Sequence, residues 1–253
     1  MANFLGLLAE RHPRVSAVLG GVIGAPTQTH LSLGAESDEL TVTWVTKREC
    51  AASFVAWGAD GASLHSSAAA NTSTYTVPPR WWQPVQLPYI HTAVISGIGS
   101  RARFAYSVGD NTSVGCVAAA PVVARAPPRR GELPLRAALM ADVGSFQVLG
   151  FEVWAALDAR TVDGGRGDVD LCVHAGDVSY AGLHAGVPLL NVSKEDEWEP
   201  LWDVYGAAHA PFTRRRAYMV GVGNHESFYG WAATRDCMLV ACRLHADCIW
   251  SAR

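Results

Sequence analysis

The hydrophobic pattern of this chain changes at a proline-rich segment, residues 127–134 (PPRRGELP), and this change constrains its fold more than any other feature. Before that segment, residues 26–126 carry short stretches in which apolar and polar residues alternate. After it, short apolar runs alternate with stretches of helical spacing. The first pattern is typical of an all-β domain and the second of βαβ units with a mainly parallel sheet. The sequence therefore predicts two domains, 26–126 and 135–253, joined by a linker at 127–134.

The first domain is expected to be a β-sandwich. Residues 40–46 (LTVTWVT) largely alternate between apolar and polar side chains, as strands with one buried face do. Further strand-like runs, separated by Gly, Pro, Asn and Asp turn residues, are 53–57, 74–77, 92–95 and 103–108. Several short strands with turn punctuation and no helical stretch favour a sandwich.

The second domain shows three strand patterns with two helical patterns between them. The strands are expected at 135–141, 170–175 and 217–222, and the helices at 146–160 and 195–209. Such alternation gives right-handed crossovers and a parallel sheet, in which ligands bind beyond the carboxyl ends of the strands.

Each of these three strands is followed by a side chain that can bind a metal. These residues are Asp142, Asp177 and Asn224, each with a glycine within two positions, and Tyr180 and His225 lie close by in the sequence. Asp and Asn are common turn residues, so any one of them alone indicates only a turn. All three at equivalent strand ends indicate a shared site of hard oxygen donors.

These residues form three ordered blocks, 142–144 (DVG), 176–180 (GDVSY) and 223–226 (GNHE), which resemble the DxG, GDxxY and GNHE motifs of the purple acid phosphatases. That family belongs to the metallophosphoesterases. Residues 26–33 and 40–46 also resemble the opening of the family's N-terminal fibronectin type III-like domain. The resemblance covers about residues 26–235. It implies a fibronectin type III-like β-sandwich followed by a metallophosphoesterase βαβ domain.

The resemblance also implies a role for each residue at a site with Fe(III) and a second divalent metal, Zn, Mn or Fe. Asp142 would bind the iron, Asp177 would bridge the two metals, and Tyr180 would bind the iron as a phenolate, the contact that colours the family. Asn224 would bind the second metal and, with His225, the substrate. His225 would act as the catalytic residue that stabilises or protonates the leaving oxygen.

The implied activity is that of an acid phosphatase, which hydrolyses small phosphate monoesters with a metal-bound hydroxide. A phosphodiesterase of the same superfamily is disfavoured by Tyr180. The alternative from another class is a non-catalytic phosphate- or glycan-binding remnant of the same fold. The second metal and the physiological substrate stay open, and so does the oligomeric state, for which a homodimer is one arrangement.

Two further blocks of the family, VxxH and GHxH, do not occur in the sequence. Only His245 follows His225, so the three histidine ligands that these blocks supply are missing. The resemblance therefore implies a metallophosphoesterase domain that is incomplete at its C-terminal side, and a poor phosphatase. Residues 237–248 contain three Cys and a His with the spacing C-x4-C-x2-H-x2-C, so a small zinc site is one alternative for this segment. The tail from Asp236 onward does not resemble the family.

The net charge and several sequence motifs limit which partners and which cellular compartment are expected for this chain. A net charge of −3 gives no reason to expect nucleic acid, and the basic run 214–216 is interpreted as a solvated helix end. No apolar run is long enough to span a bilayer, although residues 1–25 contain a stretch with the proportions of a signal peptide core. Three of the five Asn residues begin N-x-Ser/Thr sequons, and Cys50 and Cys116 could pair across the sandwich. These features favour a secreted, extracellular or vacuolar glycoprotein.

Overall fold

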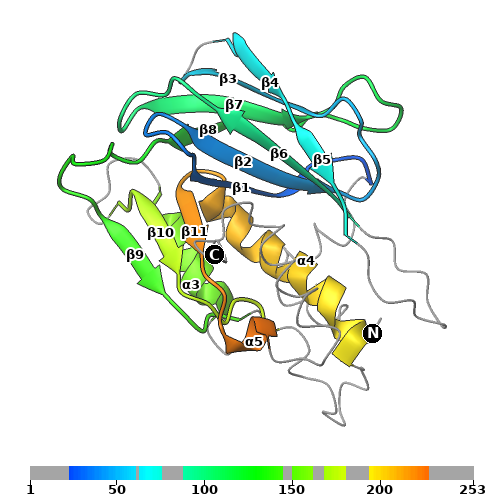
Figure 1. The fold of residues 1–253 in the computed structure, drawn as a ribbon, viewed down its shortest axis with the longest axis vertical. Coiled ribbons are helices and arrows are strands. Elements are labelled where there is room, and N and C mark those ends of the chain that lie inside the picture. Colours follow the sequence, from blue (N-terminus) through cyan, green and yellow to red (C-terminus); the bar gives the residue numbers. More distant parts are fainter. Residues whose placement is uncertain are drawn as a thin grey trace.

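A computed structural model describes residues 23–60, 63–75, 88–144, 150–161, 168–180 and 194–227. The possible signal segment, the sequon at Asn191 and the Cys- and His-containing tail all lie outside these residues. The fold class expected from the sequence, a β-sandwich followed by an α/β part, is confirmed (Figure 1). No helix is present between residues 26 and 126 in the part of the chain that the structure describes.

The sandwich consists of two sheets that face each other across an apolar core (Figure 1). One sheet has the order β4 (Ser66–Ala69), β3 (Phe54–Ala59), β7 (Arg103–Gly109) and β8 (Val122–Arg125). The other begins with β5 (Asn71–Ser73), β6 (Tyr89–Ile95), β2 (Leu40–Thr46) and β1 (Thr27–Leu33). Four of these strands, β1, β4, β5 and β8, were not expected from the alternation of the sequence, although β1 lies within the stretch 26–33 that resembles the start of a fibronectin type III-like domain. Thr74 and Tyr75 of the expected strand 74–77 lie just beyond β5, and residues 76–87 lie outside the described ranges.

The second sheet does not stop at the sandwich. Its order continues from β1 to β11 (Ala217–Val220), β10 (Leu171–His174) and β9 (Ala137–Met140), and these last three strands are parallel. The junction is a parallel pairing of Leu31 with Ala217. The boundaries 26–126, 127–134 and 135–253 stay predictions, but the two parts share one seven-stranded sheet.

The described residues of the α/β part include the helices α3 (Gly150–Ala159), α4 (Lys194–Thr213) and α5 (Asn224–Ser227). Helix α4 packs on β1 and on α3, and its residues Trp202, Tyr205 and Phe212 join a second apolar core with Trp154 of α3. No described helix is long and apolar enough to cross a membrane.

Strand β2 is buried along its whole length, which its alternating sequence did not predict. The face that carries Val42 and Trp44 lies in the sandwich core, whereas Val45 belongs to the core that contains α4. The alternation indicates one exposed face, yet Thr41 and Thr43 are buried as well. Because the sheet is covered on both sides, these short hydroxyl side chains are enclosed rather than solvated.

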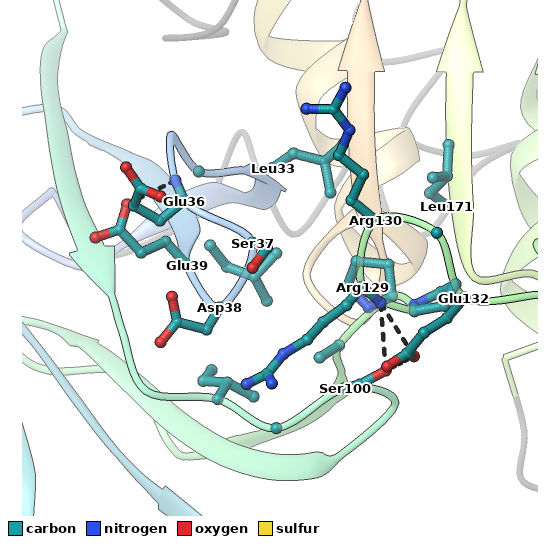
Figure 2. A pocket seen from close by; sticks show the side chains of 18 of the residues that line it. Leu33, Glu36, Ser37, Asp38, Glu39, Ser100, Arg129, Arg130, Glu132 and Leu171 are labelled. Atoms are coloured by element: carbon teal, nitrogen blue, oxygen red, sulfur yellow. Dashed lines mark hydrogen bonds between the residues drawn. The ribbon is translucent and has the colours of Figure 1, made fainter.

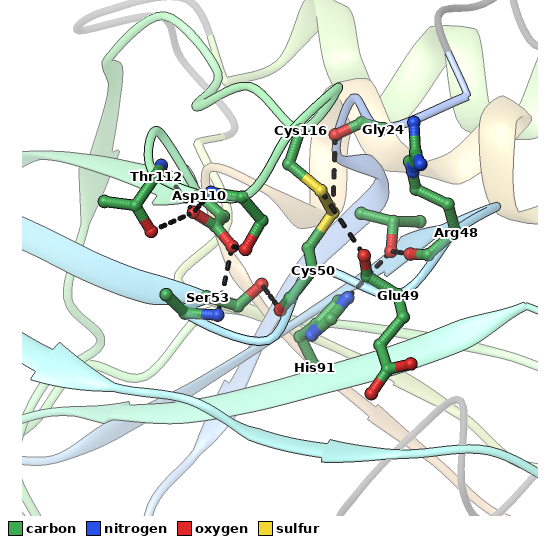
Figure 3. Close-up of a disulfide and its surroundings, with 12 residues drawn as sticks. Gly24, Arg48, Glu49, Cys50, Ser53, His91, Asp110, Thr112 and Cys116 are labelled. Atoms are coloured by element: carbon green, nitrogen blue, oxygen red, sulfur yellow. Dashed lines mark hydrogen bonds between the residues drawn. A yellow bond between two sulfur atoms is a disulfide. The ribbon is translucent and has the colours of Figure 1, made fainter.

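Cys50 and Cys116 form a disulfide, as the sequence allowed (Figure 3). Beside it, the buried carboxylate of Asp110 accepts hydrogen bonds from the backbone N–H groups of Ala52, Thr112 and Ser113. Hydrogen bonds from Ser113 and Thr112 outweigh the effect of burial and lower the pKa of Asp110. The disulfide and this carboxylate together fix the loops at one end of the sandwich.

The basic run 214–216 is not a solvated helix end, so that interpretation of the sequence was wrong. Arg216 is buried, and its guanidinium lies 3.0 Å from Asp168 Oδ1, while Arg125 of β8 lies 2.6 Å from Asp168 Oδ2. Arg125 N–H also donates to the Arg215 carbonyl, and Tyr106 Oη to the Arg214 carbonyl. The basic run therefore joins the sandwich to the parallel strands.

We expect Asp168→Asn to lower the free energy of unfolding by about 3 kcal/mol, because it leaves the buried Arg216 charge without its partner. Urea denaturation measures this effect. The matched control is Asp60→Asn, which breaks the exposed pair of Asp60 with Arg103 and should cost less than about 1 kcal/mol. Equal losses in the two variants would contradict the bridging role of Asp168.

Candidate metal centre

The predicted site residues follow the carboxyl ends of the three parallel strands. Asp142 follows β9, Asp177 and Tyr180 follow β10, and Asn224 and His225 form the first turn of α5 after β11. Register pairs join β9 to β10 and β10 to β11 residue by residue, so the three strands end at the same edge of the sheet.

Tyr180 connects the two aspartates. Its hydroxyl donates a hydrogen bond of 2.7 Å to Asp142 Oδ1 and lies 3.5 Å from Asp177 Oδ2. The phenolic proton thus lies between two carboxylates whose negative charges repel each other. Burial, followed by the hydrogen bond to Asp142 and the charges of both aspartates, raises the pKa of Tyr180.

His225 and Asn224 lie at the same strand end. The ring of His225 packs against that of Tyr180 with 4.4 Å between centroids, and His225 N–H donates to Asp177 Oδ1 at 2.9 Å. Asn224 precedes His225 as the first residue of α5, and its side chain is exposed. The structure therefore brings Asp142, Asp177, Tyr180 and His225 together and places Asn224 beside them.

The backbone at this site is strained. Asp142, Asp177 and Tyr180 all have positive φ angles, of 57°, 51° and 54°. Left-handed backbone costs a non-glycine residue on the order of 1–3 kcal/mol and is concentrated at functional sites in proteins. Asp142, Asp177 and Tyr180 share this conformation, and their side chains meet at one point. The loops therefore hold these side chains in position at a cost in stability.

Glycines let the strand-end loops approach one another. A Cβ atom on Gly223 would lie 2.2 Å from Asp177 Oδ1 and 2.4 Å from Asp177 N. One on Gly176, whose φ is +94°, would lie 2.6 Å from Gly223 N. The loop after β10 and the loop after β11 are therefore in direct backbone contact.

Glu226 lies beneath this contact, and no sequence pattern assigned it a role. Its side chain is buried and accepts hydrogen bonds from the backbone N–H groups of Asp177, Val178 and Gly223. Burial raises its pKa, against the opposing effect of these three bonds. The only sequence signal was its place at the end of the GNHE block, because nothing local shows that an acidic residue is buried.

The strand-end site has fewer His, Cys, Asp and Glu ligands than a metal site usually has. Among the described ranges, no three His, Cys, Asp or Glu side chains gather into a group that could hold a metal ion. The strand-end cluster offers two carboxylates and a phenol oxygen, with an amide and an imidazole next to them in α5.

A groove lies at the other end of the parallel strands, where the linker crosses the sandwich (Figure 2). This groove has a volume of about 630 Å³ and includes Leu171, the first residue of β10, whereas Asp177 follows the last. Acidic residues of the β1–β2 turn and Arg129 and Arg130 of the linker line it. The groove is separate from the strand-end site, and its charges have both signs.

Comparisons with known proteins agree with this fold. Residues 26–123 match the family model described as the purple acid phosphatase N-terminal domain. The structure superposes on purple acid phosphatase PPD1 from yellow lupin (Lupinus luteus) seeds with a TM-score of 0.68 and 24% identity, over 87% of this chain and 40% of that one.

Two relatives from Arabidopsis thaliana show the same similarity in sequence. Probable purple acid phosphatase 20 is 25% identical over 201 residues, which are 79% of this chain and 39% of the relative. Probable inactive purple acid phosphatase 27 is 28% identical over 232 residues, which are 81% of this chain and 35% of the relative. The chain thus spans little more than a third of their length. The N-terminal domain of the chain, its fold and its sequence relatives thus all show similarity to the purple acid phosphatases.

Proposed function

We propose that this chain carries the first part of a metal-dependent acid phosphatase site, formed by Asp142, Asp177, Tyr180 and Asn224 with His225 beside them. The convergence of two carboxylates and a phenol at the carboxyl ends of parallel strands carries this proposal. Similarity to the purple acid phosphatases makes phosphate ester hydrolysis the expected chemistry, and the relatives include one named a probable purple acid phosphatase and one named a probable inactive purple acid phosphatase.

The residues fit a site for hard cations. All the oxygen donors are of the type that Fe(III) and divalent metals such as Zn, Mn or Fe accept. The Tyr180 hydroxyl donates to Asp142 and also lies near Asp177, and this placement of a donor between two carboxylates supports the proposal that positive charge is favourable at this point. Asp142 and Tyr180 would hold Fe(III), Asp177 would bridge, and Asn224 would bind the divalent metal.

When bound, the two cations would lower the pKa of water and neutralise the charge of a phosphate ester. The protein supplies the rest. The Tyr180 hydroxyl holds Asp142, the His225 backbone N–H holds Asp177, and the ring of Tyr180 packs against the His225 ring. From there, the His225 imidazole would donate a proton to the leaving oxygen of the substrate, and Asn224 would help to bind the phosphate.

A secreted, extracellular or vacuolar location is proposed with this function. The Cys50–Cys116 disulfide supports it, since such bonds persist in oxidising compartments. Asn71 and Asn111, which begin two of the sequons, are both exposed, as glycan attachment requires. Small phosphate monoesters are the proposed substrates.

A non-catalytic role in binding phosphate or glycans is the second candidate. It is favoured by the relative named as a probable inactive purple acid phosphatase. This candidate predicts a chain that binds its ligand without turning it over, whether or not further histidines are supplied.

Hydrolysis of an aryl phosphate at acid pH distinguishes the two candidates. The rate should be compared between the 253-residue chain and a chain extended with the VxxH and GHxH motifs. We expect slow turnover in the first and a large increase in the second, because three imidazoles would complete the metal ligands. Equal rates in the two would show that the metal site has been assigned wrongly.

A further inference from the structure

Glu226 joins the loops that follow β10 and β11, which are also linked by hydrogen bonds from Gly221 N–H to the His174 carbonyl and from His225 N–H to Asp177 Oδ1. Its Oε2 accepts from Asp177 N–H at 2.9 Å and from Gly223 N–H at 2.8 Å, and its Oε1 accepts from Val178 N–H at 2.7 Å. Asp177 and Val178 follow β10, whereas Gly223 follows β11. One buried carboxylate therefore cross-links the two strand ends from below.

Asp177 is held from two directions as a result. Glu226 fixes its backbone N–H, and the N–H of His225 fixes its side chain through Oδ1. The other oxygen, Oδ2, is the one that faces Tyr180. Because the backbone of Asp177 is in the left-handed region, its geometry depends on such outside support.

The same bonds also position the start of α5. Glu226 belongs to α5 and binds Gly223, the residue immediately before Asn224. A shift of Glu226 would therefore move Asn224 and His225 relative to Asp177. Residues that hold metal ligands in place in this way commonly change metal affinity by 10–100-fold.

We propose that Glu226 is a positioning residue, which sets the distance and orientation of Asp177 relative to Asn224 and His225 without touching metal or substrate. This inference rests on the proposed metal site. It adds that the site is organised before any metal binds, by a carboxylate whose three partners are all backbone N–H groups.

The alternative is that Glu226 is important only for general stability. Asp110 provides a matched control, since it is also a buried carboxylate that accepts three backbone N–H bonds, but lies in the sandwich. A variant of either residue should lower the stability of the chain. Only a variant of Glu226 should disturb the strand ends.

The test uses the full chain with Glu226→Gln, Glu226→Asp and Asp110→Asn. In Glu226→Gln, the amide NH₂ group faces at least one backbone N–H, so one or two bonds are lost. Glu226→Asp keeps the charge but is too short to reach both loops. Amide hydrogen exchange is measured in the metal-free proteins, and Zn²⁺ affinity is measured by competition with a chromophoric chelator.

We expect exchange at Asp177, Val178 and Gly223 to rise at least about tenfold in both Glu226 variants, and Zn²⁺ affinity to fall about 10–100-fold. Asp110→Asn should change neither. Unchanged exchange at the three amides would show that the Glu226 carboxylate does not hold the two loops together. Faster exchange with unchanged Zn²⁺ affinity would contradict the positioning role of Glu226. If the unmodified chain binds no Zn²⁺ although the three amides exchange faster in the Glu226 variants, the proposed metal site is wrong. The link that Glu226 makes between the two loops would still stand.

Discussion

A Gly223→Ala chain should lose about 1–3 kcal/mol of stability and at least about tenfold in metal affinity. The added Cβ would lie 2.2 Å from Asp177 Oδ1 and 2.4 Å from Asp177 N. A carboxylate can rotate away, but the backbone nitrogen cannot move without separating the two strand-end loops. The variant therefore pushes Asp177 away from the position in which its Oδ2 faces Tyr180.

Gly221→Ala is the matched control for this change, two residues away in the same loop. Its Cβ would meet its nearest atoms, in Ala175 and His174, at 3.8 Å, which is ordinary van der Waals contact. Urea denaturation and Zn²⁺ titration of the two variants measure the difference. If both variants behave alike, the close approach of the two loops is not required for the site.

The free energy of unfolding should fall as the pH is lowered from about 7 to about 4. Burial lowers the pKa of His91 and of His174 from 6.5 to about 4 in each case. Since these folded-state values lie below 6.5, the unfolded chain takes up the protons first, and stability is lost between pH 6.5 and about 4. For the fully buried His174 the loss reaches about 3 kcal/mol at the lower end of this range.

His91 is the cleaner of the two residues to test, because it lies in the sandwich. Thr46 Oγ1 donates to the Arg48 carbonyl, so it accepts from His91 Nε2–H, and the Thr72 hydroxyl donates to His91 Nδ1. The neutral ring is thus fully hydrogen-bonded, and its plane stacks on Trp44. Protonation of the ring would replace the acceptor at Nδ1 with a second donor.

His91→Gln should reduce the change in unfolding free energy between about pH 7 and about pH 5. Comparison with the unmodified chain isolates His91 from groups of opposite effect, such as Glu226 and Asp203, whose pKa values burial raises. His65→Gln, at an exposed histidine, is the control and should leave the pH dependence unchanged. A His91→Gln chain with the pH dependence of the unmodified chain would contradict this account.

Local patterns predicted the strands and helices well where one face is apolar. The expected helix 195–209 lies within α4, and the expected strands 170–175 and 217–222 contain β10 and β11. The site residues could also be located, because parallel strands bring their carboxyl ends to one edge. The order of the three motifs along the chain was sufficient for that.

Features that depend on distant residues could not be predicted. The pairing of β1 with β11 joins Leu31 to Ala217, and no local pattern specifies such a partner. A run of three arginines is usually solvated, and only the fold brings Asp168 and Arg216 together in a buried pair. The role of Glu226 likewise depends on loops that follow two different strands.

The visible absorption spectrum of the chain loaded with Fe(III) tests the metal centre most directly, when combined with metal analysis. We expect weakly bound iron and, in the fraction of the chain that holds it, an absorption band from the Tyr180 phenolate. This band should be absent in Tyr180→Phe and retained in Tyr89→Phe, which alters a tyrosine of β6 in the sandwich. A chain that binds no iron, or a band that persists in Tyr180→Phe, would contradict the assignment of Asp142, Asp177 and Tyr180 to a metal site.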